Sequence, residues 1–326
     1  MNTYTHKARI QACLKGEILD RPPVALWRHF PVDDQDPKSL AESTLHFQHT
    51  YDFDLVKVTP ASSFCAKDWG VEDQWLGHTE GTRQYTKRII HDPHDWETLP
   101  VLDATAPYLA GQLECLRFIR RELEPETPLL QTVFSPLAQA KNLAGGETLI
   151  AHLCLYPEAV ARGLATIAET TRRFVEACGA IGIDGVFYAV QHAQASLLTF
   201  EEYQNFGVPH DLTALQPARE LWCNMLHLHG HDVYFSLLVS LTFPIVNWHD
   251  RETFPTLAEA QKQFPGVVCG GMRQDTLVYQ GQAPVQNEAA DAIQQTGGKR
   301  FILGTGCVVP VIASHGNLLA ARKSVE

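Results

Sequence analysis

The sequence has no long hydrophobic run, and its first residues contain no apolar block. No stretch approaches the roughly 20 apolar residues that a membrane-spanning helix needs. The opening, MNTYTHKARIQACLKGEI, is polar and charged throughout and lacks the apolar core of a secretory signal. We therefore expect a cytoplasmic protein that does not use a membrane as a partner.

The sequence also lacks paired cysteines and an excess of positive charge. Its eight cysteines are scattered and form no CxxC pair, which excludes the dense disulfide framework of small secreted domains and fits free thiols in a reducing compartment. Acidic residues outnumber basic ones by 37 to 26, giving a formal net charge of −11. That balance argues against a nucleic acid as partner, whereas a small anionic ligand needs only a local basic pocket.

Short β-rich segments alternate with helix-like segments after an opening helix over about residues 3–16. The predicted strands are eight: 24–28, 54–60, 128–135, 185–191, 223–230, 243–249, 266–271 and 300–306. Repeated alternation predicts an α/β fold with a parallel sheet, and eight repeats predict closure into a (β/α)8 barrel, the TIM barrel. Because we find no internal repeat or linker, we expect a single domain over residues 1–326.

Two segments are longer than a minimal barrel requires. Residues 61–100 follow the second predicted strand and contain a further strand-like stretch, TRQYTKRII, while residues 192–216 follow the fourth strand. Loops that follow strands lie over the active-site face of a TIM barrel. Both insertions are therefore expected to form lids or specificity loops.

Histidines cluster at the end of the fifth predicted strand, in LHLHGHD at residues 226–232. Side chains alternate between the two faces of a strand, so His227 and His229 are expected to point the same way. Cys307 follows the last strand in the glycine-rich turn GTGC. Two imidazoles and one thiolate form a three-ligand zinc set with an open fourth position, which is typical of catalytic zinc. His231 lies past Gly230 and is expected in a turn or a helix cap.

The residues alone leave other roles open for this set. Histidines in a barrel mouth also act as acid–base groups, and a lone cysteine often fills a core. Asp250 or Glu220 could hydrogen-bond a ligand, and the sequence does not choose between them. Trp27, Trp248 and Phe134 are compatible with packing.

Further polar residues collect at the predicted strand ends, where TIM-barrel enzymes place their chemistry. The candidates for substrate binding are Arg28, Lys57, Gln191, Trp248 and Asp250. Arg28 could instead pair with an acidic loop residue, and Lys57 could pair with Asp54 or Asp250.

Taken in order, several stretches of the sequence resemble the uroporphyrinogen decarboxylase superfamily over almost the whole chain. They are DRPPVALWR, YDFDLVKVTP, GTRQYTKRII, FPIVNWHD, TLAEAQKQFPGVVCGGMRQDTL and GGKRFILGTGCVVP. The resemblance implies a TIM barrel with one of two activities. One is decarboxylation without a cofactor. The other is zinc-dependent methyl transfer between a corrinoid (cobalamin) protein and an acceptor that is often a thiol, as in methylcobalamin:coenzyme M methyltransferases.

The match is better to the methyltransferase branch. The decarboxylase branch has an arginine-rich segment for substrate carboxylates, but LWRHFPVDDQDP keeps only Arg28 and continues with acidic residues. The methyltransferase branch has a His-x-Cys pair and a later cysteine, which His227 and Cys307 match, with His229 in place of the first cysteine. An imidazole in place of a thiolate leaves the metal more positive, so the acceptor need not be a thiol.

The resemblance thus implies zinc at His227, His229 and Cys307, a corrinoid carrier protein as partner and a small-molecule methyl acceptor or donor. The alternative enzyme is a metal-free decarboxylase of a carboxylated substrate that uses Arg28, Lys57 and a nearby aspartate. A third hypothesis is a barrel without catalysis that binds a corrinoid protein. The sequence leaves the oligomeric state open, a homodimer being one option.

Overall fold

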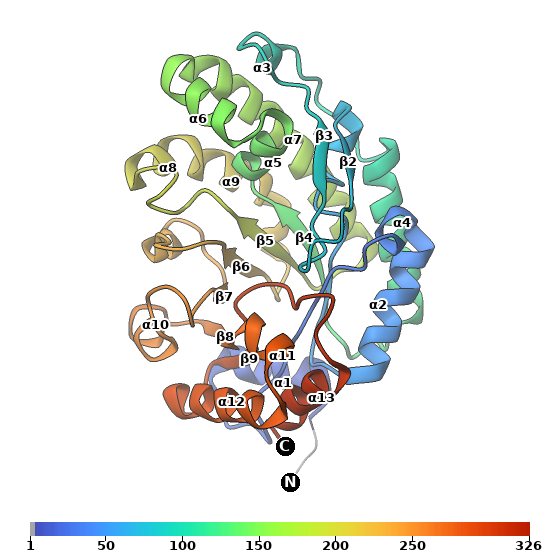
Figure 1. Cartoon of the computed structure of the whole chain (residues 1–326), viewed down its shortest axis with the longest axis vertical. Helices are drawn as coiled ribbons and strands as arrows, with labels where there is room; N and C mark the ends of the chain where they lie inside the picture. Colours follow the sequence, from blue (N-terminus) through green and yellow to red (C-terminus); the bar gives the residue numbers. More distant parts are fainter. Residues whose placement is uncertain (1–3) are drawn as a thin grey trace.

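The computed structural model describes residues 4–326, except for the side chains of Leu238 and Val239. Seven parallel strands form a curled sheet in the order β1-β4-β5-β6-β7-β8-β9, and helices surround it (Figure 1). The strands are Val56–Val58 (β1), Leu129–Phe134 (β4), Gly185–Val190 (β5), Met225–Leu228 (β6), Ile245–Trp248 (β7), Val267–Met272 (β8) and Phe301–Thr305 (β9). Every residue of these strands is buried, as expected for a parallel sheet that is covered on both faces.

The segment before β1 fills the eighth position of the barrel. Val24 forms a parallel bridge with Leu303 of β9, and the amide of Asp54 donates to the carbonyl of Val24. The strand predicted over residues 24–28 is reduced to this single bridge, and the Trp27 carbonyl accepts from the Val309 amide in the loop after β9. The predicted TIM-barrel architecture is confirmed.

The helices lie outside the sheet, and several begin at residues suited to capping. Thr5 caps the first helix, and Thr256 with Glu259 forms a capping box at α10. The α-helices are His6–Lys15 (α1), Pro37–Tyr51 (α2), Asp95–Thr98 (α3), Pro107–Glu122 (α4), Pro136–Ala144 (α5), Gly146–Leu155 (α6), Pro157–Ile181 (α7), Phe200–Phe206 (α8), Val208–Ala214 (α9), Leu257–Gln263 (α10), Gln274–Tyr279 (α11), Gln282–Thr296 (α12) and His315–Lys323 (α13). The 3-10 helices are Asp33–Gln35 (η1), Lys67–Trp69 (η2), Gln216–Glu220 (η3) and Phe235–Val239 (η4). Within residues 4–326, no helix is both long enough and apolar enough to cross a membrane.

The first insertion contains an antiparallel hairpin of Glu72–Gln74 (β2) and Gln84–Lys87 (β3), which confirms the strand predicted in TRQYTKRII. The loop of this hairpin lies against the barrel mouth. A Cβ at Gly81 would come within 2.4 Å of the Cβ of His29, so only glycine permits this approach. The carbonyl of Thr79 accepts from the amide of Val311, which ties the hairpin to the loop after β9.

The second insertion, residues 192–216, is mostly helical. Thr199 and Glu202 form a capping box that starts α8, and α9 follows directly. Asp211 of α9 is fully buried and accepts hydrogen bonds from the hydroxyls of Tyr188 and Tyr203, both at 2.6 Å. These contacts hold α9 against β5. Since α8 begins at Phe200, the loop after β5 is shorter than the insertion predicted over residues 192–216.

Candidate metal centre

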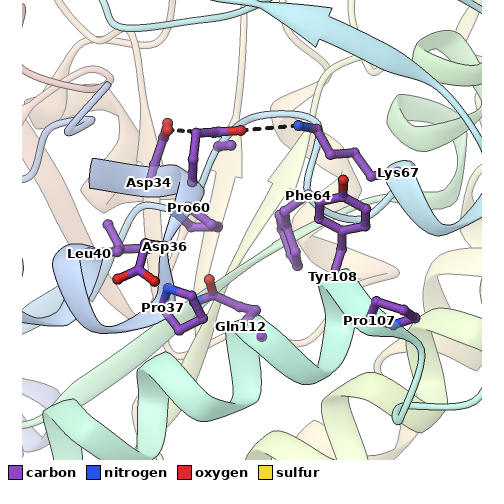
Figure 2. Close-up of a pocket in the computed structure, with 13 residues that line it drawn as sticks. Asp34, Asp36, Pro37, Leu40, Pro60, Phe64, Lys67, Pro107, Tyr108 and Gln112 are labelled. Atoms are coloured by element: carbon purple, nitrogen blue, oxygen red, sulfur yellow. Dashed lines mark hydrogen bonds between the residues drawn. The ribbon is translucent and has the colours of Figure 1, made fainter. Parts of the chain in front are cut away.

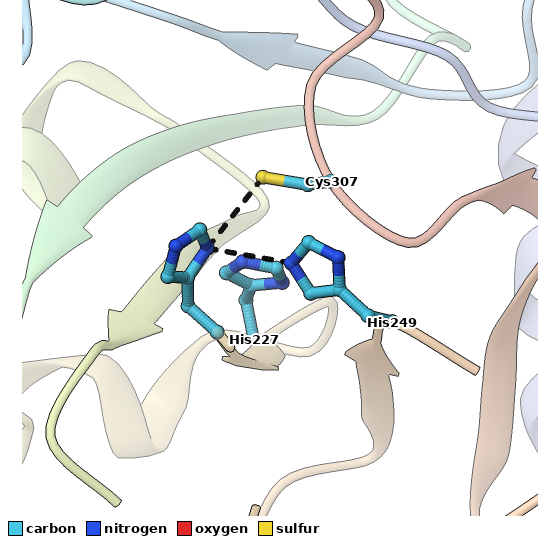
Figure 3. Close-up of side chains that lie close together, drawn as sticks. His227, His249 and Cys307 are labelled. Atoms are coloured by element: carbon cyan, nitrogen blue, oxygen red, sulfur yellow. Dashed lines mark hydrogen bonds between the residues drawn. The ribbon is translucent and has the colours of Figure 1, made fainter. Parts of the chain in front are cut away.

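Three imidazoles and one thiol converge at the carboxyl ends of β6, β7 and β9. They belong to His227, His229, His249 and Cys307, and one potential ligand atom from each lies within 4.8 Å of the others. Figure 3 shows the side chains of His249 and Cys307 approaching His227 from different segments. We call these four residues the His3Cys cluster.

Strand register explains why the histidines meet. His227 of β6 pairs with Asn247 of β7, and Leu228 pairs with Trp248. Because side chains alternate along a strand, the next residues, His229 and His249, face the barrel interior together with their partners two positions earlier.

A glycine brings the cysteine to the histidines. A Cβ at Gly306 would lie 2.7 Å from the Cα of His249, closer than side-chain carbons approach a backbone. The loop after β9 can therefore pass beside His249 only because residue 306 has no side chain. The next residue is Cys307, whose Sγ lies 3.8 Å from His229 Nδ1.

Two separations between ligand atoms are close to those in a tetrahedral zinc site, within a set that spans up to 4.8 Å. His249 Nε2 lies 3.4 Å from His229 Nδ1, and Cys307 Sγ lies 3.8 Å from the same nitrogen. Tetrahedral zinc with the usual bond lengths separates two nitrogens by about 3.3 Å, and a nitrogen from a sulfur by about 3.6 Å. Imidazole nitrogen and thiolate sulfur are also the donors that zinc prefers.

Hydrogen bonds of Asn247 set the tautomer of His227. The Nδ2 group of Asn247 donates to the carbonyls of Cys269 and Thr305, both at 2.9 Å. The amide oxygen is therefore the atom that faces His227 Nδ1, at 2.7 Å, and it can only accept. Nδ1 of His227 thus carries the proton, which leaves Nε2 with a free lone pair for a metal.

Glu252 plays a comparable part for His249. One carboxylate oxygen of Glu252 lies 3.5 Å from His249 Nδ1, on the side of the ring away from the Nε2 that faces His229. A carboxylate beside one ring nitrogen favours a proton there and leaves the other nitrogen free. The sequence pointed to Asp250 or Glu220 for such a role. Glu220 is exposed at the end of η3, before β6 begins.

Burial keeps the cluster uncharged in the absence of a cation. Burial, with the neighbouring imidazoles, lowers the pKa of His229 to about 3 and lowers the pKa values of His227 and His249 as well. Burial also raises the pKa of Cys307 to about 12. The imidazoles therefore have lone pairs available at neutral pH, and a metal would have to displace the thiol proton.

The structure brings together the three predicted ligands, His227, His229 and Cys307, and adds His249, which the sequence analysis did not count as a ligand. The signal for His249 was present in the sequence. His249 ends the strand predicted at 243–249, and TIM-barrel enzymes place their chemistry at the carboxyl ends of strands.

Two of the predicted substrate-binding residues lie next to the cluster. Lys57 is buried in the barrel interior, with Nζ 4.4 Å from the ring centroid of Phe187, and this ring stacks on His227. Gln191 follows β5 and accepts a hydrogen bond from Lys141 Nζ at 2.9 Å.

The other candidates have different surroundings. Arg28 lines a pocket with residues of α2 and His315 of α13. Trp248 is fully buried, and its indole nitrogen donates to the Pro255 carbonyl, consistent with packing. Asp250 accepts from the amide of Gly271 at 3.0 Å and thereby joins the end of β7 to β8. His231 is exposed beyond the cluster.

A separate cavity of about 210 Å³ lies between α2, α4 and the loop after β1 (Figure 2). Pro37, Phe64 and Tyr108 contribute to its walls, and Lys67 Nζ donates to Gln35 along one edge. No member of the His3Cys cluster lines this cavity. Its lining also contains Asp34, Asp36 and Lys67, so it is a second, partly polar pocket that is separate from the cluster.

Comparisons with known proteins agree with this fold. A methyltransferase from Methanosarcina mazei is 16% identical with a TM-score of 0.84, and the match covers 98% of each chain. A B12-independent methionine synthase from Shewanella sp. W3-18-1, in complex with selenomethionine, is 13% identical with a TM-score of 0.59, covering 93% of this chain and 94% of that one. A putative B12-independent methionine synthase from Listeria monocytogenes is 12% identical with a TM-score of 0.54, covering 99% and 92%.

At these identities, the three structures show a shared fold. No curated protein matches the sequence. The family model of uroporphyrinogen decarboxylase, however, matches residues 5–326. The protein therefore belongs to the uroporphyrinogen decarboxylase family.

Proposed function

We propose that the protein is a zinc-dependent methyltransferase that moves a methyl group between a corrinoid carrier protein and a small-molecule acceptor or donor. The observation that carries the proposal is the His3Cys cluster, a nitrogen and sulfur donor set inside the mouth of a TIM barrel. A decarboxylase that works without a metal has no need of such a set. The fold similarity to the Methanosarcina mazei methyltransferase adds support.

In this proposal, His227, His229 and Cys307 hold zinc, and Asn247 keeps Nε2 of His227 available. Bound zinc would polarise a heteroatom of the substrate and lower its pKa. His249 stands at the fourth position, which the sequence analysis left for substrate. We propose that the substrate displaces His249 from this position.

A released His249 could then act on the substrate proton. Its Nε2 faces the cluster, and its Nδ1 lies 3.5 Å from the carboxylate of Glu252. A neutral imidazole that is oriented by a carboxylate is suited to general-base catalysis. His249 Nε2 would accept the proton of the incoming heteroatom, and Glu252 would stabilise the resulting imidazolium.

The loops over the barrel mouth support the docking of a carrier protein. Large apolar side chains that are 40% to 75% exposed lie in loops that follow strands or the first bridge: Val32, Leu197, Phe254 and Ile312. These loops are on the same face as the cluster. Exposed apolar side chains on this face are available for contact with a protein partner.

The first experiment is elemental analysis of the purified protein, combined with methyl transfer from methylcobalamin to small thiols and amines. We expect about one zinc per chain in the wild type. Both the metal and the transfer should be lost in His229→Ala and in Cys307→Ser. Absence of zinc from protein prepared without chelator, or retention of zinc in both variants, would contradict the proposal.

A second candidate is a metal-free decarboxylase of a carboxylated substrate. Membership of the uroporphyrinogen decarboxylase family and the buried ammonium of Lys57 favour it. Arg28, which this function would also use, lines the pocket next to α2 instead. Release of carbon dioxide from a porphyrinogen by protein without zinc would support this candidate over methyl transfer.

A further inference from the structure

The cavity between α2 and α4 is large enough for a small organic molecule. Its walls come from η1, α2, the loop after β1, η2 and the start of α4 (Figure 2). Leu40, Pro60 and Phe64 contribute apolar surface. The cavity has a volume of about 210 Å³, whereas an apolar cavity of about 150 Å³ already holds benzene. A molecule with one ring and a polar group therefore fits the available space.

Two helices begin at the wall of this cavity, but their first amides already have acidic partners. Free amides at a helix N-terminus attract anions. At the start of α2, Asp36 accepts from the amide of Ser39 at 2.8 Å. At the start of α4, Asp68 accepts from the amides of Tyr108 and Leu109 at 3.1 and 3.0 Å. These carboxylates would repel a second anion, so the cavity is not suited to an anionic ligand.

The carboxylate of Asp34 has an oxygen without a partner. The side chain is fully buried, and its Oδ1 accepts from Gln35 Nε2 at 2.6 Å and lies 3.5 Å from the guanidinium of Arg83. Its Oδ2 has no hydrogen-bond partner within residues 4–326. Burial raises the pKa of this carboxyl, because Gln35 and Arg83 replace the lost hydration only in part. A cationic donor at Oδ2 would stabilise the ionised form.

Gln112 supplies a second acceptor, from α4. The orientation of its amide follows from Gln131, whose Nε2 donates to the Thr132 carbonyl at 2.7 Å. Oε1 of Gln131 therefore faces Gln112 and accepts from its Nε2 at 2.8 Å. The other amide atom, Oε1 of Gln112, has no hydrogen bond in the part of the chain that the structure describes. Asp34 and Gln112 thus bring acceptors to one cavity from two different elements.

The cations beside these acceptors already share a carboxylate. Lys67 Nζ lies 3.2 Å from Asp73 and 5.2 Å from the ring centroid of Tyr108. Nε of Arg83 also pairs with Asp73. The cavity lining itself contains two carboxylates, those of Asp34 and Asp36, and one ammonium, that of Lys67. An additional ammonium from outside the chain fits this balance of charge.

We propose that the cavity between α2 and α4 is a second ligand site, for a small amine whose ammonium pairs with Asp34 and whose apolar body packs against Leu40 and Phe64. Gln112 offers an acceptor for a further donor of the ligand. Gln35 is exposed and bridges Asp34 and Lys67, so its side chain is expected to move aside when the ligand enters. The site is separate from the His3Cys cluster, and the inference does not depend on the proposed function.

Ligand-observed NMR titrations with a matched pair of probes test the charge of the ligand. Cyclohexylamine carries an ammonium, and cyclohexanol has the same ring without the charge. The protein is treated with a chelator first, so that the amine cannot bind to a metal at the cluster. The wild type should bind cyclohexylamine about 10-fold more tightly than cyclohexanol, the effect of one hydrogen-bonded charge. Asp34→Asn should remove this preference, whereas Asp36→Asn, which keeps a capping side chain at α2, should retain it.

A variant that fills the cavity tests the location of the site. Gly111 of α4 lines the cavity, and a Cβ at this position would lie 3.4 Å from Cγ of Pro37, which also lines it. Gly111→Leu should therefore occupy the space and abolish binding of both probes. Gly179→Leu is the matched control, because Gly179 is also helical and a Cβ there meets no atom within 4 Å. It should leave the binding of both probes unchanged.

The refuting results are equal binding of the two probes by the wild type, no saturable binding of the amine, or amine binding that survives in Gly111→Leu. A preference that is kept in Asp34→Asn and lost in Asp36→Asn would also refute the pairing of the ammonium with Asp34. If Asp34→Asn does not fold, Gly111→Leu still decides whether the cavity is the site. Neither zinc content nor methyl transfer enters these outcomes, so failure of the proposed function would leave this inference standing.

Discussion

Replacing Asn247 with leucine tests the link between the fold and the proposed metal centre. Asn247 is fully buried and makes three hydrogen bonds, two to carbonyls of β8 and β9 and one to His227. At about 1 kcal/mol for each bond, Asn247→Leu should destabilise the protein by about 3 kcal/mol. Leucine also cannot hold His227 in the tautomer with the proton on Nδ1. Loss of such an orienting partner typically weakens metal binding about 10- to 100-fold.

A matched control separates metal binding from stability. Asn317 is also a buried asparagine that donates to two carbonyls, those of Leu277 and Gln280, both at 2.9 Å. Asn317→Leu should therefore lower the free energy of unfolding by about 2 kcal/mol. It should leave zinc affinity unchanged, because α13 does not contact the cluster through this residue.

Two assays decide the outcome. Competition with a chromophoric chelator gives the zinc affinity of the wild type, Asn247→Leu and Asn317→Leu. 15N NMR of the imidazole nitrogens in the metal-free wild type should show that His227 is protonated at Nδ1. A proton on Nε2 of His227, or a zinc affinity of Asn247→Leu within threefold of wild type, would refute the reasoning.

Three further changes test other parts of the structure. Gly306→Ala should displace the loop that carries the thiol and lower zinc occupancy measured by elemental analysis. Gly179→Ala, which meets no atom within 4 Å, should leave occupancy unchanged, and equal occupancy in both would contradict the packing argument. Glu252→Gln should weaken zinc binding about 10-fold in the chelator assay, and unchanged affinity would exclude the carboxylate from orienting its histidine. Burial raises the pKa of Asp211 from 3.8 to about 7, so the folded state binds the extra proton and the wild type loses stability as pH rises through that window. At 1.4 kcal/mol per pKa unit, the free energy of unfolding of Asp211→Asn, relative to the wild type, should rise by up to about 4 kcal/mol from pH 4 to pH 8. Thermal unfolding at both pH values measures this change. A difference that does not depend on pH would refute the titration of a buried carboxyl.

Local patterns were sufficient for the barrel and for most of the cluster. Alternation of strands and helices predicted the architecture, and alternation within one strand predicted that His227 and His229 share a face. The GTGC turn predicted Cys307 at the end of the last strand. Each of these features depends on residues that are close together in the sequence.

Features that depend on pairing between distant segments were not predicted. The role of Asn247 requires the register between β6 and β7 and two carbonyls from β8 and β9. The backbone hydrogen bond between Trp27 and Val309 joins segments at opposite ends of the chain. Arg28 matched a family position in the sequence, but the direction of its side chain depends on how α2 and α13 pack.

The hairpin of the first insertion couples the entrance of the barrel to the loop that carries Cys307. Its loop is bonded through the Thr79 carbonyl to the amide of Val311, four residues after Cys307. Lifting the hairpin to admit a substrate must break this bond or pull the cysteine loop with it. The imidazoles lie in β6 or directly after β6 and β7, and this bond does not join the hairpin to those strands. Opening of the entrance would thus act on the thiol first, so that substrate entry and any coordination by the sulfur would be mechanically linked.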